Sequence, residues 1–139
     1  MMLSILLPLY LASASFSLAT PEQLATIESL SGAWGFDGSD NSNRDFLQKP
    51  GRCGEPNVLV IRINRETTPD GAVRWRLHAG ARDQHGGLVT QVESSTGVQR
   101  VTVEFFGPIG PDVDFFEIEG DRLTVVSGAV HTRFERCRT

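Results

Sequence analysis

The stretch VRWRLHA at positions 73–79 alternates apolar and polar side chains without interruption. A period of two residues places the apolar members on one face of an extended chain and the polar members on the other. The turn sequence TPDG at 68–71 comes just before it, where proline presets one backbone dihedral angle and glycine accepts a positive one. Residues 73–79 therefore predict a β-strand that is buried on one side only.

Segments with the same alternation follow one another from Asn57 to Cys137, and Gly-Ala-Trp at 32–34 opens a matching run upstream. Each segment between Asn57 and Cys137 ends at Gly, Pro or Asp, so the links are short and each strand pairs with the next. One further expected strand begins at Trp34, and the others cover 58–64, 88–92, 101–105, 112–121, 123–125 and 130–134. Turns are expected at 83–87, 94–97 and 107–111. An open sheet would leave two edges exposed, and closure removes both. We therefore expect an all-β fold, an eight-stranded antiparallel up-and-down barrel with a short N-terminal helix.

The acidic residues of the expected sixth strand change parity along the chain. They stand at even positions up to 114 and at odd positions from 117 onward. A β-bulge at Phe115-Phe116 would place them all on one face. Alternating acids are typical of the solvent-exposed face of a strand, and we prefer this interpretation to a calcium site or paired catalytic carboxylates. The residues are Asp112, Asp114, Glu117, Glu119 and Asp121.

Residues 1–19 lack charged side chains, are mostly apolar up to Leu11 and end in small residues. Serines and a proline interrupt the apolar run before it reaches the roughly 18–20 residues of a membrane span. The segment is therefore predicted to be a signal peptide, which makes the protein secreted or periplasmic. Residues 20–139 are enough for one domain with one modest core. This domain opens with a predicted helix over 20–30, capped by Thr20 and with Pro21 in its first turn.

Cys53 and Cys137 are the only cysteines in the chain. An oxidising compartment favours a disulfide between them, and closing so long a loop would stabilise the fold by about 4.5 kcal/mol on the chain-entropy model. The net charge is −4 and the 13 basic residues are scattered rather than clustered. We therefore expect no nucleic-acid partner. The interrupted apolar run at 1–19 likewise predicts no membrane span.

The three histidines, His78, His85 and His131, show no recognisable spacing for zinc ligands. We interpret them as solvated surface imidazoles, with a haem ligated by His131 as the less favoured alternative. The chain has no nucleophile elbow, phosphate-binding glycine loop or metalloprotease motif. We therefore expect no enzymatic activity, no metal and no cofactor.

Gly32-Ala33-Trp34, placed on the first strand directly after a short helix, is similar to the Gly-X-Trp signature of lipocalins and the wider calycin group. That resemblance implies an arginine from the end of the barrel packed across the tryptophan, with Arg133 and Arg136 both eligible. A cysteine near the C-terminus that bridges to an early loop is also similar to lipocalins. The sequence ESLSGAW at 28–34 resembles the start of the periplasmic inhibitors of bacterial alkaline metalloproteases, which implies an N-terminal arm that enters a protease cleft.

Two functions are consistent with these features. In the first, the barrel is a binding module for a small apolar ligand, and the loop 37–56 covers the mouth of the pocket. In the second, residues 20–31 and nearby loops dock into a protease and the barrel is only a scaffold. The large aromatic and aliphatic content predicts a mostly filled interior rather than a large cavity. The predicted ligand-binding residues are Trp34, Trp75, Leu77, Phe105 and Phe134.

Overall fold

The computed structural model describes residues 19–39, 50–80, 85–107 and 110–138. Residues 1–18 of the predicted signal peptide and 40–49 of the predicted mouth loop lie outside the described residues. The described part of the chain forms one helix followed by eight strands. Their bounds are α2 Pro21–Ser29, β1 Gly32–Ser39, β2 Leu59–Thr67, β3 Val73–Gly80, β4 His85–Ser95, β5 Val98–Gly107, β6 Gly110–Glu119, β7 Arg122–Ser127 and β8 Val130–Arg136.

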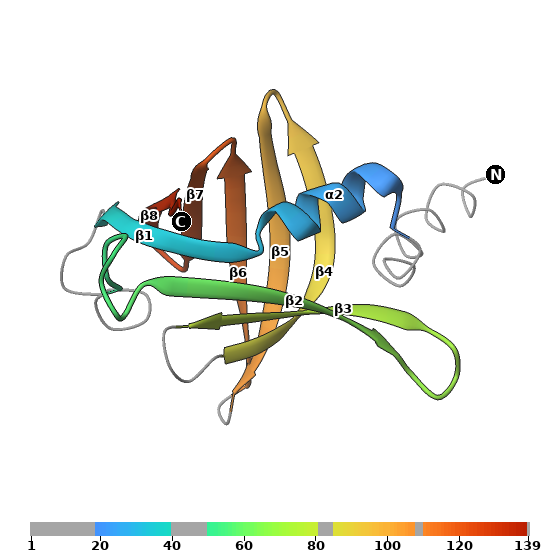
Figure 1. Ribbon diagram of the computed structural model, residues 1–139. Helices are drawn as coiled ribbons and strands as arrows, with labels where there is room; N and C mark the ends of the chain where they lie inside the picture. The colour runs from blue at the N-terminus through green and yellow to red at the C-terminus, as the bar shows by residue number, and fades with distance from the viewer. Residues whose placement is uncertain (1–18, 40–49, 81–84, 108–109, 139) are drawn as a thin grey trace.

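The eight strands are hydrogen-bonded in sequence order into a closed antiparallel barrel (Figure 1). The barrel closes where β1 pairs with β8, which places Trp34 opposite Arg136 and Phe36 opposite Phe134. This is the predicted fold, with its short N-terminal helix. The part of the chain that the structure describes contains no helix long and apolar enough to cross a bilayer.

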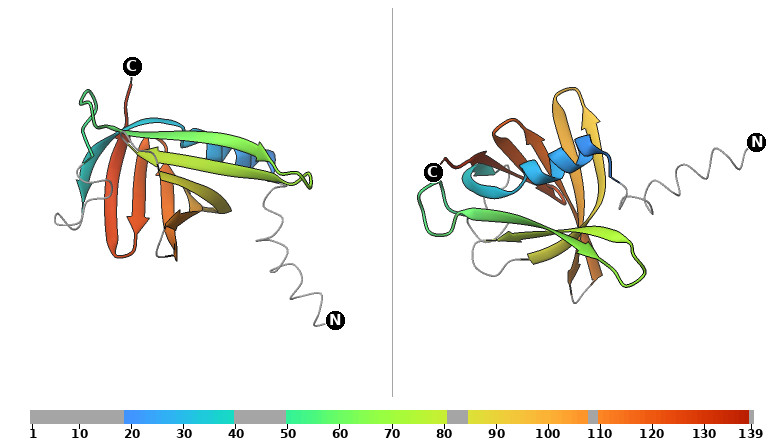
Figure 2. Two further views of the ribbon diagram at one scale, coloured as in Figure 1. Left: turned by 90° about the horizontal axis from the view of Figure 1, so that it is seen from below. Right: turned by 45° about the vertical axis from the view of Figure 1, so that its right-hand side comes forward.

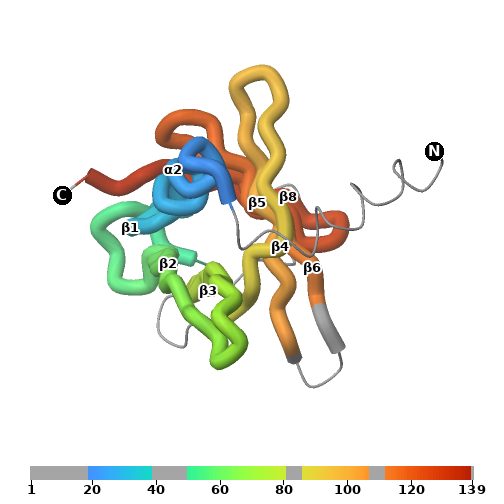
Figure 3. Tube along the Cα trace, turned by 90° about the vertical axis from the view of Figure 1, so that its right-hand side faces the viewer, coloured from blue at the N-terminus to red at the C-terminus, as the bar shows by residue number. Residues whose placement is uncertain are grey.

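The helix α2 covers one end of the barrel. The amide of Gln23 donates to Thr20 Oγ1 at 3.1 Å, and the amide of Thr20 donates to Gln23 Oε1 at 2.9 Å. This reciprocal capping box, followed by proline at the helix start, explains why the helix begins here. Ile27 and Leu30 are fully buried in the barrel core. Figure 3 looks onto this end, with α2 in front of the strands.

We call the end of the barrel opposite α2 the far end. The β2–β3 and β4–β5 hairpins have their turns at the α2 end, where they extend beyond the barrel in different directions (Figures 1 and 2). The strand β5 runs toward the far end, where Gly107 pairs with Gly110 at the start of β6. Strand direction therefore fixes which residues of each strand lie near α2 and which lie near the far end.

A disulfide joins Cys53 to Cys137 across 84 positions of sequence, with the two Cα atoms 5.4 Å apart. It fastens the segment before β2 to the chain just after β8, as predicted. Gly35 in β1 makes this approach possible, because a Cβ there would lie 2.5 Å from Cys53 Sγ. The backbone supports the same contact, since the amide of Phe36 donates to the carbonyl of Gly51 at 2.8 Å.

The prediction of a turn over 83–87 is wrong in its second half. The strand β4 begins at His85, and Gly87 pairs with Leu77 of β3. A Cβ on Gly87 would lie 2.7 Å from Val103 Cγ1. The glycine therefore permits close packing inside a strand, which the sequence presents in the same way as a turn.

The predicted bulge at Phe115-Phe116 is also wrong. The strand β6 keeps one register against both β5 and β7 through this point. The described strands shift register instead in β1, after Phe36, and in β4, after Val89. With unbroken alternation in β6, Asp114 shares the inward face with the fully buried Phe116. The change of parity among the acids is therefore a change of face.

Candidate binding site

The five predicted ligand-binding residues all belong to the barrel interior, but in two different settings. Trp34 and Leu77 are fully buried and Phe134 is 1% exposed. Trp75 and Phe105 are only partly buried and pack against this core. The first three residues are therefore part of the packed core that holds the barrel together, and only the latter two retain exposed surface.

Trp34 has a structural role that its contacts make explicit. Its indole Nε1 donates to the carbonyl of Leu30 at 2.8 Å. The guanidinium carbon of Arg136 lies 4.3 Å from the centre of its ring. Arg136 is thus the arginine packed across the tryptophan, which decides between the two candidates. Trp34 links α2 to the strands and has its polar atom and one ring face already occupied.

A polar group lies inside the barrel where the sequence led us to expect only apolar side chains. Asp114 of β6 is 6% exposed, and it lies opposite Ser127 of β7. The Ser127 hydroxyl donates a hydrogen bond to the Asp114 carboxylate. None of the ion pairs found among the described residues involves Asp114. Within the described part of the chain the carboxyl is therefore buried without an ion-pair partner, an arrangement that costs folding free energy.

Its buried position makes Asp114 a weaker acid than an exposed aspartate. Burial raises the pKa of the Asp114 carboxyl above its ordinary value, because the charged form loses hydration. The negative charge of Asp112, two residues nearer the far end on the same face, acts in the same direction. The hydrogen bond from Ser127 opposes both effects. The balance still leaves the proton bound more tightly than in an exposed aspartate.

Thr132 of β8 adds a second unusual group to the same inner surface. Its side chain is fully buried, and its Oγ1 has no hydrogen-bond partner in the described part of the protein. It pairs with Val125, two residues before Ser127 on β7. A buried hydroxyl without a partner costs about 1–3 kcal/mol. We call Asp114, Ser127 and Thr132, on three adjacent strands, the polar inner wall.

Aromatic rings flank the polar inner wall on both sides. Phe105 and Phe116 pack with ring centres 6.4 Å apart on the β5–β6 side. Phe36 and Phe134 pack edge to face with ring centres 6.3 Å apart on the β1–β8 side. A ligand that reached the wall from the far end would therefore meet hydrogen-bonding groups between apolar rings. This combination of an apolar lining with a few convergent polar groups is typical of small-molecule sites.

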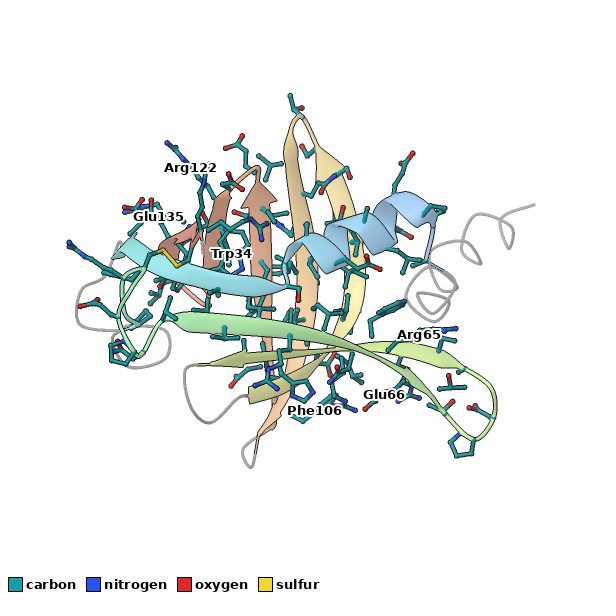
Figure 4. All side chains as sticks on the ribbon, in the orientation of Figure 1. Trp34, Arg65, Glu66, Phe106, Arg122 and Glu135 are labelled. Carbon is teal, nitrogen blue, oxygen red and sulfur yellow. A yellow bond between two sulfur atoms is a disulfide. The ribbon has the colours of Figure 1, made fainter. Side chains whose placement is uncertain are left out.

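Two hollows have linings that the structure describes. One has a volume of about 230 Å³ and is lined mainly by charged and polar residues of β6, β7 and β8, together with the core residues Leu123 and Phe134. The other has a volume of about 520 Å³ and lies beside the β4–β5 hairpin. Arg100 and Glu117, which border the second, form a 2.7 Å ion pair with each other. Figure 4 shows Arg122, which borders the first, pointing outward while Trp34 lies within the barrel.

The histidines do not gather into a site within the described residues. His131 is exposed on β8, where it pairs with Val126, and His78 is half-buried beside Gly86. The side chain of His85 lies outside the described residues. No group of three or more His, Cys, Asp or Glu side chains among the described residues is placed to hold a metal ion.

The polar inner wall was missed by sequence reasoning, although the sequence contains a signal for it. The acids of β6 change parity, and without a bulge they must divide between the two faces. Comparison with protein-family models, with curated proteins and with solved structures found no match for this chain. The eight-stranded antiparallel closed barrel is consistent with a lipocalin-like fold, as is the packing of Arg136 on Trp34.

Proposed function

We propose that this chain is an exported, non-enzymatic barrel that binds a small, mostly apolar ligand at its far end. The observation that carries this proposal is the polar inner wall. Asp114 is buried without a counter-charge and Thr132 is buried without a hydrogen-bond partner in the described part of the chain. Groups that lower stability in this way are expected mainly at functional sites. A ligand that supplied the missing partners would offset their cost.

The proposed site uses only part of the residue set predicted from the sequence. Phe105 and the polar inner wall contact the ligand, with Asp112 at the rim. Trp34, Leu77 and Phe134 support the site from below as part of the packed core. At the end covered by α2, Ile27 and Leu30 are fully buried in the core, so the proposed site lies at the far end.

Native mass spectrometry of the protein purified gently from its own host tests this proposal. We expect a population heavier than the disulfide-bonded chain, and loss of the added mass when the protein is denatured. A second expectation is that the added mass returns when the stripped protein is incubated with an extract of the host. Protein that is empty after both steps would refute the carrier function.

The alternative function, inhibition of a protease by residues 20–31, has a structural cost. Ile27 and Leu30 are fully buried, and Arg136 donates to the carbonyl of Ser29 at 2.7 Å. A protease cleft that required this segment in extended form would have to pull α2 out of the barrel. We therefore expect no change in peptide hydrolysis when the intact protein is added to an alkaline metalloprotease. Inhibition at equimolar concentration would favour the alternative.

A further inference from the structure

We infer that the ligand is a small organic cation, an amine with an apolar body, whose ammonium group binds Asp114 inside the barrel. This inference rests on the proposed function and specifies the class of ligand. It is based on the charged and hydrogen-bonding groups of the polar inner wall and on the aromatic rings near them.

The inner face carries negative charge near the far end. Asp112 and Asp114 are two residues apart on β6 and share one face, so their charges add at the same part of the barrel. Arg136, which shares the inward parity on β8, lies at the α2 end and is engaged with Trp34, Ser29 and Asp121. In the described part of the inner face, the charge near the far end is therefore acidic.

The wall offers complementary partners for an ammonium group. The Asp114 carboxylate accepts one hydrogen bond from Ser127 and has lone pairs left for another donor. The Thr132 hydroxyl has no partner in the described structure, is fully buried, and faces the same interior. It can accept a hydrogen bond from a polar group of a ligand that reaches it. An anion would meet like charge here, and a neutral alcohol would leave the carboxylate without a counter-charge.

The aromatic neighbours suit the rest of such a ligand. Phe105 pairs with Asp112, and Phe116 lies two residues from Asp114 on β6. Phe36 pairs with Phe134, which lies two residues from Thr132 on β8. Aromatic faces attract ammonium groups and pack against apolar bodies. Phe116 and Phe134, two residues from Asp114 and Thr132 toward α2, are already buried in the core, so a one-ring amine is a better fit than a long-chain lipid.

The test compares three probes of nearly equal size, benzylamine, benzyl alcohol and benzoate, by calorimetric titration into the full mature protein stripped of any bound ligand. We expect saturable binding of benzylamine and no measurable binding of benzoate. We expect benzyl alcohol to bind more weakly than benzylamine by about 30-fold, as for a lost partner of a buried charge. Equal affinity for amine and alcohol, or preference for benzoate, would overturn the inference.

Variants assign the binding to the wall. Asp114→Asn keeps the shape of the side chain and is expected to weaken benzylamine binding by about 30-fold. Thr132→Val, which removes only the hydroxyl, is expected to weaken it by about tenfold. Glu119→Gln removes one charge from the outer face of the same strand and should leave the affinity unchanged. Circular dichroism of each variant verifies the fold, and retention of full affinity by folded Asp114→Asn would refute the role of this carboxyl.

The outcomes also separate this inference from the proposed function. Protein from its host that carries an acid or a neutral compound would support the carrier function and refute the amine. Protein that is empty and binds none of the three probes would refute both.

Discussion

Arg136 should contribute more to stability than the other charged residues near the β1–β8 pairing. It contacts the end of α2, Trp34 of β1, and Asp121 just before β7. Its Nη2 donates to the carbonyl of Ser29 at 2.7 Å, and its Nε lies 3.1 Å from Asp121 Oδ1. Its guanidinium stacks on Trp34 at 4.3 Å. The first contact satisfies a carbonyl at the C-terminal end of α2, where the helix leaves acceptors without partners.

The magnitude follows from these three contacts. The part-buried, charge-assisted hydrogen bond to Ser29 contributes about 1.5 kcal/mol. The stack on Trp34 contributes about 1 kcal/mol. The Asp121 pair is solvent-accessible, and we assign it about 0.5 kcal/mol. Arg136→Ala should therefore lower the free energy of unfolding by about 3 kcal/mol, and Arg136→Lys by roughly half as much, because lysine keeps the charge but loses the planar fork.

The assay is urea denaturation followed by tryptophan fluorescence, with the disulfide intact. Arg138→Ala is the matched control, since Arg138 contacts the same Asp121 but its side chain is 86% exposed. We expect the control to stay within about 0.5 kcal/mol of the wild type. In thermal unfolding, Arg136→Ala should lower the midpoint by roughly 12 °C, at about 4 °C per kcal/mol for a domain of this size. Equal effects of Arg136→Ala and Arg138→Ala would refute the reasoning.

Three other predictions concern the staple, the wall and one glycine. Replacing both Cys53 and Cys137 by serine should lower the free energy of unfolding by up to about 4.5 kcal/mol, measured in urea beside the oxidised wild type; an unchanged midpoint would show that the bridge adds nothing. Asp114→Asn should raise the melting temperature at pH 7, because the raised pKa means that ionisation of this carboxyl penalises the folded state. The penalty is absent below the ordinary pKa of 3.8 and grows as the pH rises through the pKa of the folded state. The rise in melting temperature should therefore shrink toward pH 3, and a rise independent of pH would contradict this cause. Gly87→Ala should cost about 1–3 kcal/mol in calorimetric unfolding, because its Cβ would lie 2.7 Å from Val103 Cγ1; a neutral effect would mean that β4 can move aside.

The elements of the fold could be predicted because each one follows from local chemistry. Thr20 and Pro21 specify the start of α2 through a cap and a preset dihedral angle. The alternation at 73–79 specifies β3, whose inward Leu77 and Ala79 are buried and whose inward Val73 and Trp75 are partly buried. The disulfide followed from the cysteine count and the expected compartment.

The errors arose where one sequence pattern has two structural causes. A pair of glycines at 86–87 is compatible with a turn and with close strand packing, and only the side chains of β5 distinguish them. A change of parity among acids is compatible with a bulge and with a change of face. The choice between Arg133 and Arg136 depended on the register of β8 against β1, which places Arg136 opposite Trp34. These features depend on contacts between strands distant in sequence.

The most direct test of the binding hypothesis compares the wild-type protein and Asp114→Asn, both expressed in the natural host and measured side by side by native mass spectrometry. We predict a wild-type population with a small added mass, which dissociates on denaturation and carries a basic nitrogen, and a folded variant that has lost most of it. Equal loading of the two proteins would contradict the central role given to the buried carboxyl.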